Sequence, residues 1–173
     1  MKAKDIKYIA IHCTASFATV QGVLNYWKKV LGWQSPGYHV LIDEKGIKHY
    51  LQPFNLRSNG VRYYNGETLH ISYIGGVDKR NTSIAKDTRT NAQRIAIIEV
   101  IQEMIQYLED NGKKDLNTGL MVLGHRDFSP DKNADGVISK YERLKECPSF
   151  DAIEEYKMYS SSNKKQLLPY NRK

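Results

Sequence analysis

Two histidines and a cysteine have the side chains of a metal site. His12 ends the apolar run IKYIAIH, His125 ends the apolar segment GLMVLGH, and Cys147 opens the stretch CPSFD. Imidazole nitrogen and thiolate sulfur are ligands of Zn²⁺, and three protein ligands leave a fourth position for water. An open position is typical of a catalytic rather than a structural zinc ion. The three residues are therefore candidate ligands of a catalytic zinc ion.

The spacing of these residues matches no regular zinc motif, so alternatives stay open. A histidine is more often a surface residue or a satisfied core side chain than a ligand. Cys13 and Cys147 are also candidates for a disulfide, but a chain without a signal peptide is expected to meet a reducing compartment. Cys13 follows His12 on a presumed strand, where successive side chains point to opposite faces. We interpret Cys13 as a small buried apolar residue.

Length and composition fit one globular domain. Of the 173 residues, 40% are hydrophobic and 26% are charged, which is ordinary for such a domain. No apolar run approaches the roughly 18 residues that span a bilayer, and the N-terminus lacks the features of a signal peptide. We expect one domain over residues 1–159 and a basic polar tail at 160–173. We also expect synthesis and folding in a cytoplasm, or export by a route that uses no classical signal.

The basic charge favours attraction to a polyanion. A net charge of +7 with a pI of about 9.3 suits nucleic acid, an anionic membrane or the bacterial cell wall as a partner. Charge alone does not choose among these. Because no dense basic run with interleaved aromatic residues is present, we predict no nucleic-acid partner.

Strand and helix patterns alternate along the chain. The expected elements are, in order, a strand at 6–12, a helix at 20–31, a hairpin at 38–52, a strand at 69–76, a helix from about 91 to 111, a strand at 119–125 and a short helix at 150–158. Thr90 with Gln93 matches a capping box ahead of the long helix. Its expected buried face consists of Ile95, Ile98, Ile101, Ile105 and Leu108.

This alternation predicts the fold class and the place of the site. It is typical of an α/β domain with a mixed central β-sheet flanked by helices. His12 and His125 fall at the C-terminal ends of their strands, where open α/β sheets place their binding sites.

Five motifs, in this order, resemble those of the zinc-dependent N-acetylmuramoyl-L-alanine amidases of the phage-lysozyme and peptidoglycan-recognition-protein superfamily. They are IAIHCTAS, GWQSPGYHVLIDEKG, YIGGVD, GHRD and KECPSFD, and the resemblance covers residues 6 to about 157. It implies an amidase domain at 1–159 that cleaves the bond between N-acetylmuramic acid and L-alanine of peptidoglycan. It also implies that zinc is bound by His12, His125 and Cys147.

The resemblance further implies catalytic roles for Tyr38 and Lys145. Lys145 would place a positive charge on the oxyanion that forms, and Tyr38 would hydrogen-bond the bound water or the intermediate. His39 and His49 are interpreted as structural. His70 departs from the family, which usually has glycine there, and this leaves the fit of the adjoining substrate groove open. We expect the groove residues in 53–68 and 77–89.

A second departure is the segment DKNADGVISKYE, which matches the EF-hand calcium loop D-x-[DN]-x-[DN]-G-x5-E. Gly136 permits the sharp turn of such a loop, and Ile138 would supply an apolar anchor. The alternative is a solvated turn without an ion. The predicted Ca²⁺ ligands are Asp131, Asn133, Asp135, Val137 through its carbonyl, Ser139 and Glu142.

Three classes of function remain open from the sequence. The first is a zinc amidase, the second a recognition module that binds peptidoglycan without cutting it, and the third a regulator that binds a partner such as a polymerase. Retention of Cys147 favours the amidase, because a non-catalytic relative is expected to lose a ligand. The chain resembles a phage or prophage endolysin, which stays cytoplasmic until its release to the cell wall. We expect a monomer, although the sequence does not determine the oligomeric state.

Overall fold

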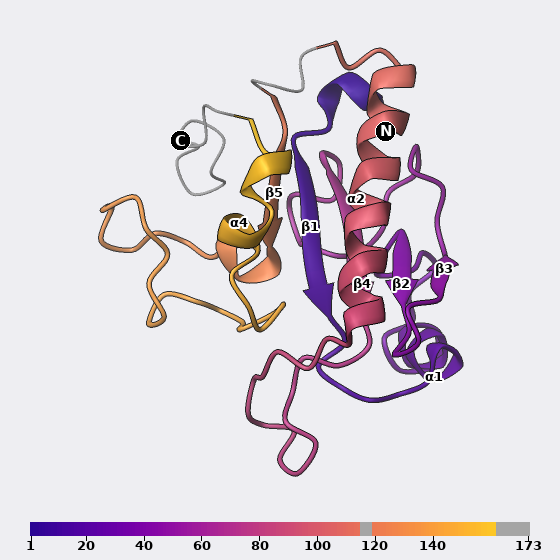
Figure 1. Ribbon diagram of the computed structural model, residues 1–173, viewed down its shortest axis with the longest axis vertical. Helices are drawn as coiled ribbons and strands as arrows, with labels where there is room; N and C mark the ends of the chain where they lie inside the picture. The colour runs from indigo at the N-terminus through magenta and orange to yellow at the C-terminus, as the bar shows by residue number, and fades with distance from the viewer. Residues whose placement is uncertain (115–118, 162–173) are drawn as a thin grey trace.

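The computed structural model describes residues 1–114 and 119–161. Its strands form one sheet in the order β3-β2-β4-β1-β5, around which the helices and loops are arranged (Figure 1). The strands are β1 (Tyr8–Cys13), β2 (Val40–Ile42), β3 (Lys48–Tyr50), β4 (Thr68–Tyr73) and β5 (Met121–Gly124). The α-helices are α1 (Val20–Asn25), α2 (Asn91–Asp110) and α4 (Ala152–Glu155), and the shorter turns are Ala3–Asp5, Tyr26–Val30, His125–Phe128 and Lys157–Tyr159.

The sheet is mixed, as the sequence predicted. Strand β1 runs parallel to both neighbours, β4 and β5, and β2 runs parallel to β4. Only β3 is antiparallel, because a tight hairpin joins it to β2. The C-terminal ends of the parallel strands therefore meet at one edge of the sheet, at the lower end in Figure 1.

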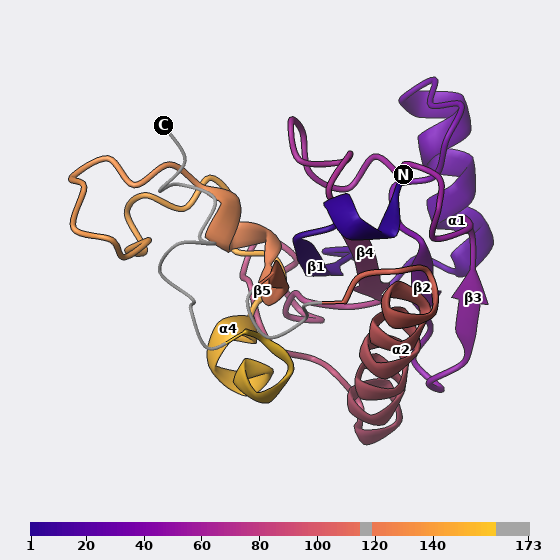
Figure 2. The same cartoon turned by 90° about the horizontal axis from the view of Figure 1, so that it is seen from above.

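Helices cover both faces of the sheet. Figure 2 shows α2 and α4 on one side and α1 on the other. Every residue of β1 and β4 is buried, including the polar face of β4 that Thr68, His70 and Ser72 form. The main core lies between α2 and the sheet and includes Ile9, Ile11, Leu69, Ile71, Ile97 and Ile101.

Helix α2 begins as predicted, and its buried face includes the predicted Ile101 and Leu108 but differs at the other three positions. The Thr90 side chain accepts from the Gln93 amide, and the Gln93 side chain accepts from the Thr90 amide, which confirms the capping box. The expected position of Ile95 is wrong: it is 59% exposed, because it lies two residues before Ile97 and so on nearly the opposite side of the helix. Ile98 and Ile105 are only partly buried. The buried stripe is Ala96, Ile97, Val100, Ile101, Met104 and Leu108.

Two other predicted helices form in altered shape. The helix expected at 20–31 is α-helical to Asn25 and π-helical over Tyr26–Val30. The helix expected at 150–158 is interrupted at Tyr156, which separates α4 from the 3₁₀ turn Lys157–Tyr159. Within the described ranges, no helix is both long and apolar enough to cross a membrane.

The first residues of the predicted C-terminal tail attach to β5. The Ser160 hydroxyl oxygen accepts from the Val122 amide at 2.9 Å, and the Ser161 amide donates to the Leu120 carbonyl at 2.8 Å. The rest of that predicted tail, 162–173, lies outside the described residues.

Candidate metal centre

His12, His125 and Cys147 converge at the C-terminal edge of the sheet. His12 lies near the end of β1, and His125 directly follows the parallel neighbour β5. The Nδ1 atom of His12 lies 3.1 Å from Nδ1 of His125 and 3.9 Å from Sγ of Cys147. All three ligand atoms lie within 4.8 Å of one another. The tertiary structure thus brings His12 to two side chains that follow it by more than a hundred residues.

The geometry of this cluster suits a tetrahedral zinc ion. Zn–N bonds of about 2.0 Å and Zn–S bonds of about 2.3 Å place two nitrogens about 3.3 Å apart and nitrogen and sulfur about 3.5 Å apart. The observed separations of 3.1 and 3.9 Å are close to these values. Among residues 1–114 and 119–161, no fourth His, Cys, Asp or Glu joins the group. The donor set therefore fits a zinc ion with an open coordination position.

Backbone contacts hold Cys147 beside the two strands. Its Sγ accepts a hydrogen bond from the Cys13 amide at 3.2 Å, and its carbonyl accepts from the Arg126 amide at 2.7 Å. The peptide bond from Cys147 to Pro148 is cis. Gly124 allows the close approach, since a Cβ there would lie 2.4 Å from Pro148. Cys13 itself is buried and its thiol is free, which confirms its interpretation as a buried apolar residue.

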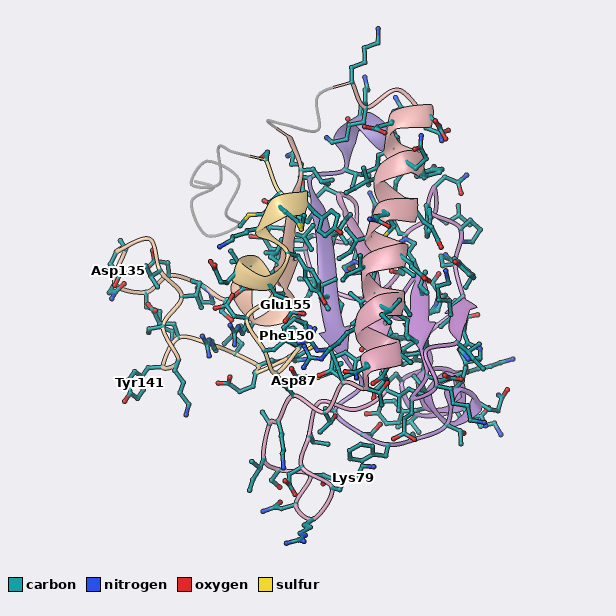
Figure 3. The ribbon with its side chains drawn as sticks, in the orientation of Figure 1. Lys79, Asp87, Asp135, Tyr141, Phe150 and Glu155 are labelled. Carbon is teal, nitrogen blue, oxygen red and sulfur yellow. The ribbon has the colours of Figure 1, made fainter. Side chains whose placement is uncertain are left out.

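A buried arginine anchors the segment that follows Cys147. The Arg89 side chain is fully buried and donates to Asp87 at 2.8 Å and to Glu155 at 2.7 Å. Its guanidinium also lies over the ring of Phe150, 3.2 Å from the centroid. Figure 3 shows Asp87, Phe150 and Glu155 gathered near the end of β1. This cluster ties the loop before α2 to the chain that carries the cysteine, a role that the sequence did not indicate.

Tyr38 lies at the metal centre. Its ring centroid is 4.9 Å from that of His12 and 5.2 Å from that of Trp27, so the phenol is wedged between them. Burial raises the pKa of Tyr38, and the neighbouring Cys147 raises it further. The hydroxyl therefore stays protonated and is available as a hydrogen-bond donor.

Lys145 is exposed but close enough to act electrostatically on the cluster. Burial, together with the charge of Lys145, lowers the pKa of His125 to about 4. Burial, His125, His70 and Lys145 together lower the pKa of His12 well below its ordinary value. Both imidazoles are therefore neutral near pH 7, the form that binds metal. Burial raises the pKa of the Cys147 thiol.

The remaining histidines differ in their surroundings. His39 donates from Nε2 to the Leu56 carbonyl at 2.9 Å and accepts at Nδ1 from the His70 amide at 2.9 Å, so it joins a loop to β4. His49 pairs with Asp43 within the hairpin. Both contacts are structural, as expected. His70 is different, because its Nδ1 lies 3.1 Å from Nε2 of His12.

Sequence reasoning did not place His70 in this contact. His12 and His70 occupy the same face of adjacent strands, but the pairing register that brings them together is a tertiary property. The sequence did offer one signal for this contact, because His70 is a polar residue within a strand that is otherwise expected to be buried.

The EF-hand-like loop lies on the long connection between His125 and Cys147. In Figure 3, Asp135 and Tyr141 project from this connection, away from the sheet. Ile138 is buried and Gly136 has a φ of +83°, as expected of such a loop. Glu142 accepts from the amide and hydroxyl of Ser139 at 2.8 and 2.7 Å, and these bonds lower the pKa of its carboxyl to about 2.

The other predicted ligands of the loop bond mainly to one another. Asp131 accepts from the Gly136 amide at 2.8 Å, and Asp135 accepts from the Asn133 side chain at 2.9 Å and from the Val137 amide at 2.8 Å. In the described part of the chain, the loop carboxylates do not form a group of ligand atoms like that of the histidines and Cys147. Calcium binding therefore stays a prediction.

Several known proteins are similar to this chain in sequence or in fold. The profile of a family described as N-acetylmuramoyl-L-alanine amidase matches residues 2–148. The endolysin of Klebsiella phage KP32 is 26% identical over 153 residues, which cover 87% of this chain and 85% of that protein. The fold is similar to that of the N-acetylmuramoyl-L-alanine amidase LysC from Clostridium intestinale URNW, with a TM-score of 0.61 at 18% identity over 93% of this chain and 90% of that chain.

A similar fold is also found in PGRP-SA from Apis mellifera, with a TM-score of 0.62 at 17% identity over 88% of this chain and 82% of that chain. The mixed sheet and the cluster at its C-terminal edge thus define an amidase-type α/β domain. Because the family profile covers most of the sequence, the chain belongs to the N-acetylmuramoyl-L-alanine amidase family.

Proposed function

We propose that this protein is a zinc-dependent hydrolase that cleaves the amide bond between N-acetylmuramic acid and L-alanine of peptidoglycan. The observation that carries the proposal is the convergence of His12, His125 and Cys147 in a member of the amidase family. A non-catalytic recognition module of the same fold is the second candidate, favoured by the structural likeness to PGRP-SA. Such a module has no need of a complete set of metal ligands, and this chain has one.

The surrounding residues suit amide hydrolysis. When bound, zinc supplies Lewis-acid polarisation of a carbonyl oxygen and lowers the pKa of water toward 7. Tyr38 remains protonated and donates a hydrogen bond to the oxygen that becomes negative. Lys145 lies close enough to lower the pKa of both histidines, and its positive charge stabilises the same oxyanion.

The proposed site of action is the cell wall. The likeness to the KP32 endolysin supports a protein that remains in the cytoplasm until it is released to the wall. The net charge of +7 favours adsorption to an anionic wall, and that attraction weakens as salt rises.

The test uses purified protein and isolated cell walls. Cleavage of the proposed bond exposes new N-terminal alanine without new reducing sugar ends, so both groups are counted over time. The Cys147→Ala variant is expected to expose no new N-terminal alanine and to release no soluble fragments, whereas Cys13→Ala, a matched cysteine variant, retains both. Continued release by Cys147→Ala would contradict the mechanism. Binding of the wild-type protein to walls without any release would favour the recognition module.

A further inference from the structure

The two ring nitrogens of His12 face different partners. Nδ1 faces His125 and Cys147, whereas Nε2 lies 3.1 Å from Nδ1 of His70. His12 is 1% exposed and His70 is fully buried, so water does not compete for this contact. His70 belongs to β4, the strand beside β1, and its ring lies behind the His12 ring as seen from the metal ligands.

Hydrogen bonding determines the tautomers of the pair. A neutral imidazole that presents its Nδ1 lone pair to a metal carries its hydrogen on Nε2. His12 therefore donates from Nε2, and Nδ1 of His70 accepts. Histidine ligands usually donate their second N–H to a carboxylate, a carbonyl or water, and this contact sets ring orientation and ligand basicity. Here a second imidazole occupies that position.

Packing fixes the acceptor in place. The His70 ring stacks on His39, with centroids 5.7 Å apart and an interplanar angle of 13°. The His70 amide donates to Nδ1 of His39, which fixes the backbone. Gly60 leaves room for the ring, because a Cβ at that position would lie 2.4 Å from Nδ1 of His70.

The second ring nitrogen of His70 makes no hydrogen bond, within the part of the chain that the structure describes, that would account for a buried histidine at this position. Its Nε2 atom is buried without a hydrogen-bond partner among the described residues. An unpaired buried donor is destabilising. The favourable polar contact of the ring is therefore the one to His12.

We propose that His70 is a positioning residue of the metal centre: it accepts the Nε2 hydrogen of His12 and holds the ring so that Nδ1 faces the metal ion. This inference rests on the proposed role of His12 as a metal ligand. It assigns a function to a position at which the family resemblance leads us to expect glycine.

Zinc affinity, measured by competition with a chromophoric chelator in the absence of substrate, tests the proposal. His70→Leu keeps the volume but removes the acceptor, and it is expected to weaken zinc binding roughly 10- to 100-fold. His70→Asn places a carbonyl oxygen near the position of Nδ1 and is expected to restore most of the affinity. Gly60→Ala displaces the ring without changing its chemistry and is expected to weaken binding. His49→Leu, a hairpin variant remote from the site, is the matched control and is expected to bind as tightly as the wild type.

A second readout separates orientation from general damage. Cobalt bound in place of zinc reports ligand geometry through its visible absorption, which is expected to change in His70→Leu and to return in His70→Asn. Equal zinc affinity of wild type and His70→Leu, or equal weakening in His70→Asn, would overturn the role of His70. A wild-type protein that binds no zinc would instead contradict the proposed function itself.

Discussion

The buried imidazole of His39 is expected to make the metal-free protein sensitive to acid. Burial lowers its pKa from 6.5 to about 4, although the hydrogen bond that Nε2 donates to the Leu56 carbonyl acts in the opposite direction. The unfolded chain takes up the proton below pH 6.5, whereas the folded protein takes it up only near pH 4. The contribution of neutral His39 to the unfolding free energy is therefore fully present above pH 6.5 and is lost as the pH falls toward 4. At roughly 1.4 kcal/mol per pKa unit, the loss is about 3 kcal/mol.

The assay is urea unfolding between pH 7 and pH 4 in the presence of a chelator. His39→Asn keeps an acceptor for the His70 amide but does not titrate, so its fall in unfolding free energy over this range is expected to be about 3 kcal/mol smaller than that of the wild type. The buried imidazoles of His12, His70 and His125 remain in both proteins. Val30→Asn, at an exposed position that carries no titratable group, is the control and keeps the wild-type slope. Identical slopes for wild type and His39→Asn would refute the reasoning.

Three further predictions concern other parts of the molecule. Thr90→Ala removes the N-cap of α2 and is expected to lower the unfolding free energy by about 1 kcal/mol, measured by urea unfolding; no loss would mean that the capping box contributes nothing. Calcium is expected to raise the melting temperature of the zinc-loaded wild type but not that of Glu142→Gln, and no shift in the wild type would remove the calcium prediction. Tyr38→Phe is expected to lower kcat on cell walls on the order of 10²-fold with unchanged zinc affinity, and an unchanged kcat would exclude its catalytic role.

Local patterns were enough to predict most of the secondary structure. The capping box of Thr90 and Gln93 marks the start of α2, and the turn at Glu44–Gly46 marks the hairpin, because each signal lies within a few residues of the structure that it produces. The uninterrupted apolar run of β1 indicated a strand covered on both sides. The candidate ligands were also visible, since His12 and His125 end or follow apolar strands.

The tertiary structure decided how these pieces meet. The buried face of α2 depends on where the sheet lies, and so Ile95 is exposed although it is apolar. The contact between His12 and His70 depends on the pairing of β1 with β4. The Arg89 side chain is fully buried because Glu155, from a distant segment, joins the neighbouring Asp87 as its acidic partner. Apolar spacing and capping act within a few residues of the chain, whereas strand register and the contacts of one imidazole with another are fixed only when distant segments pack together.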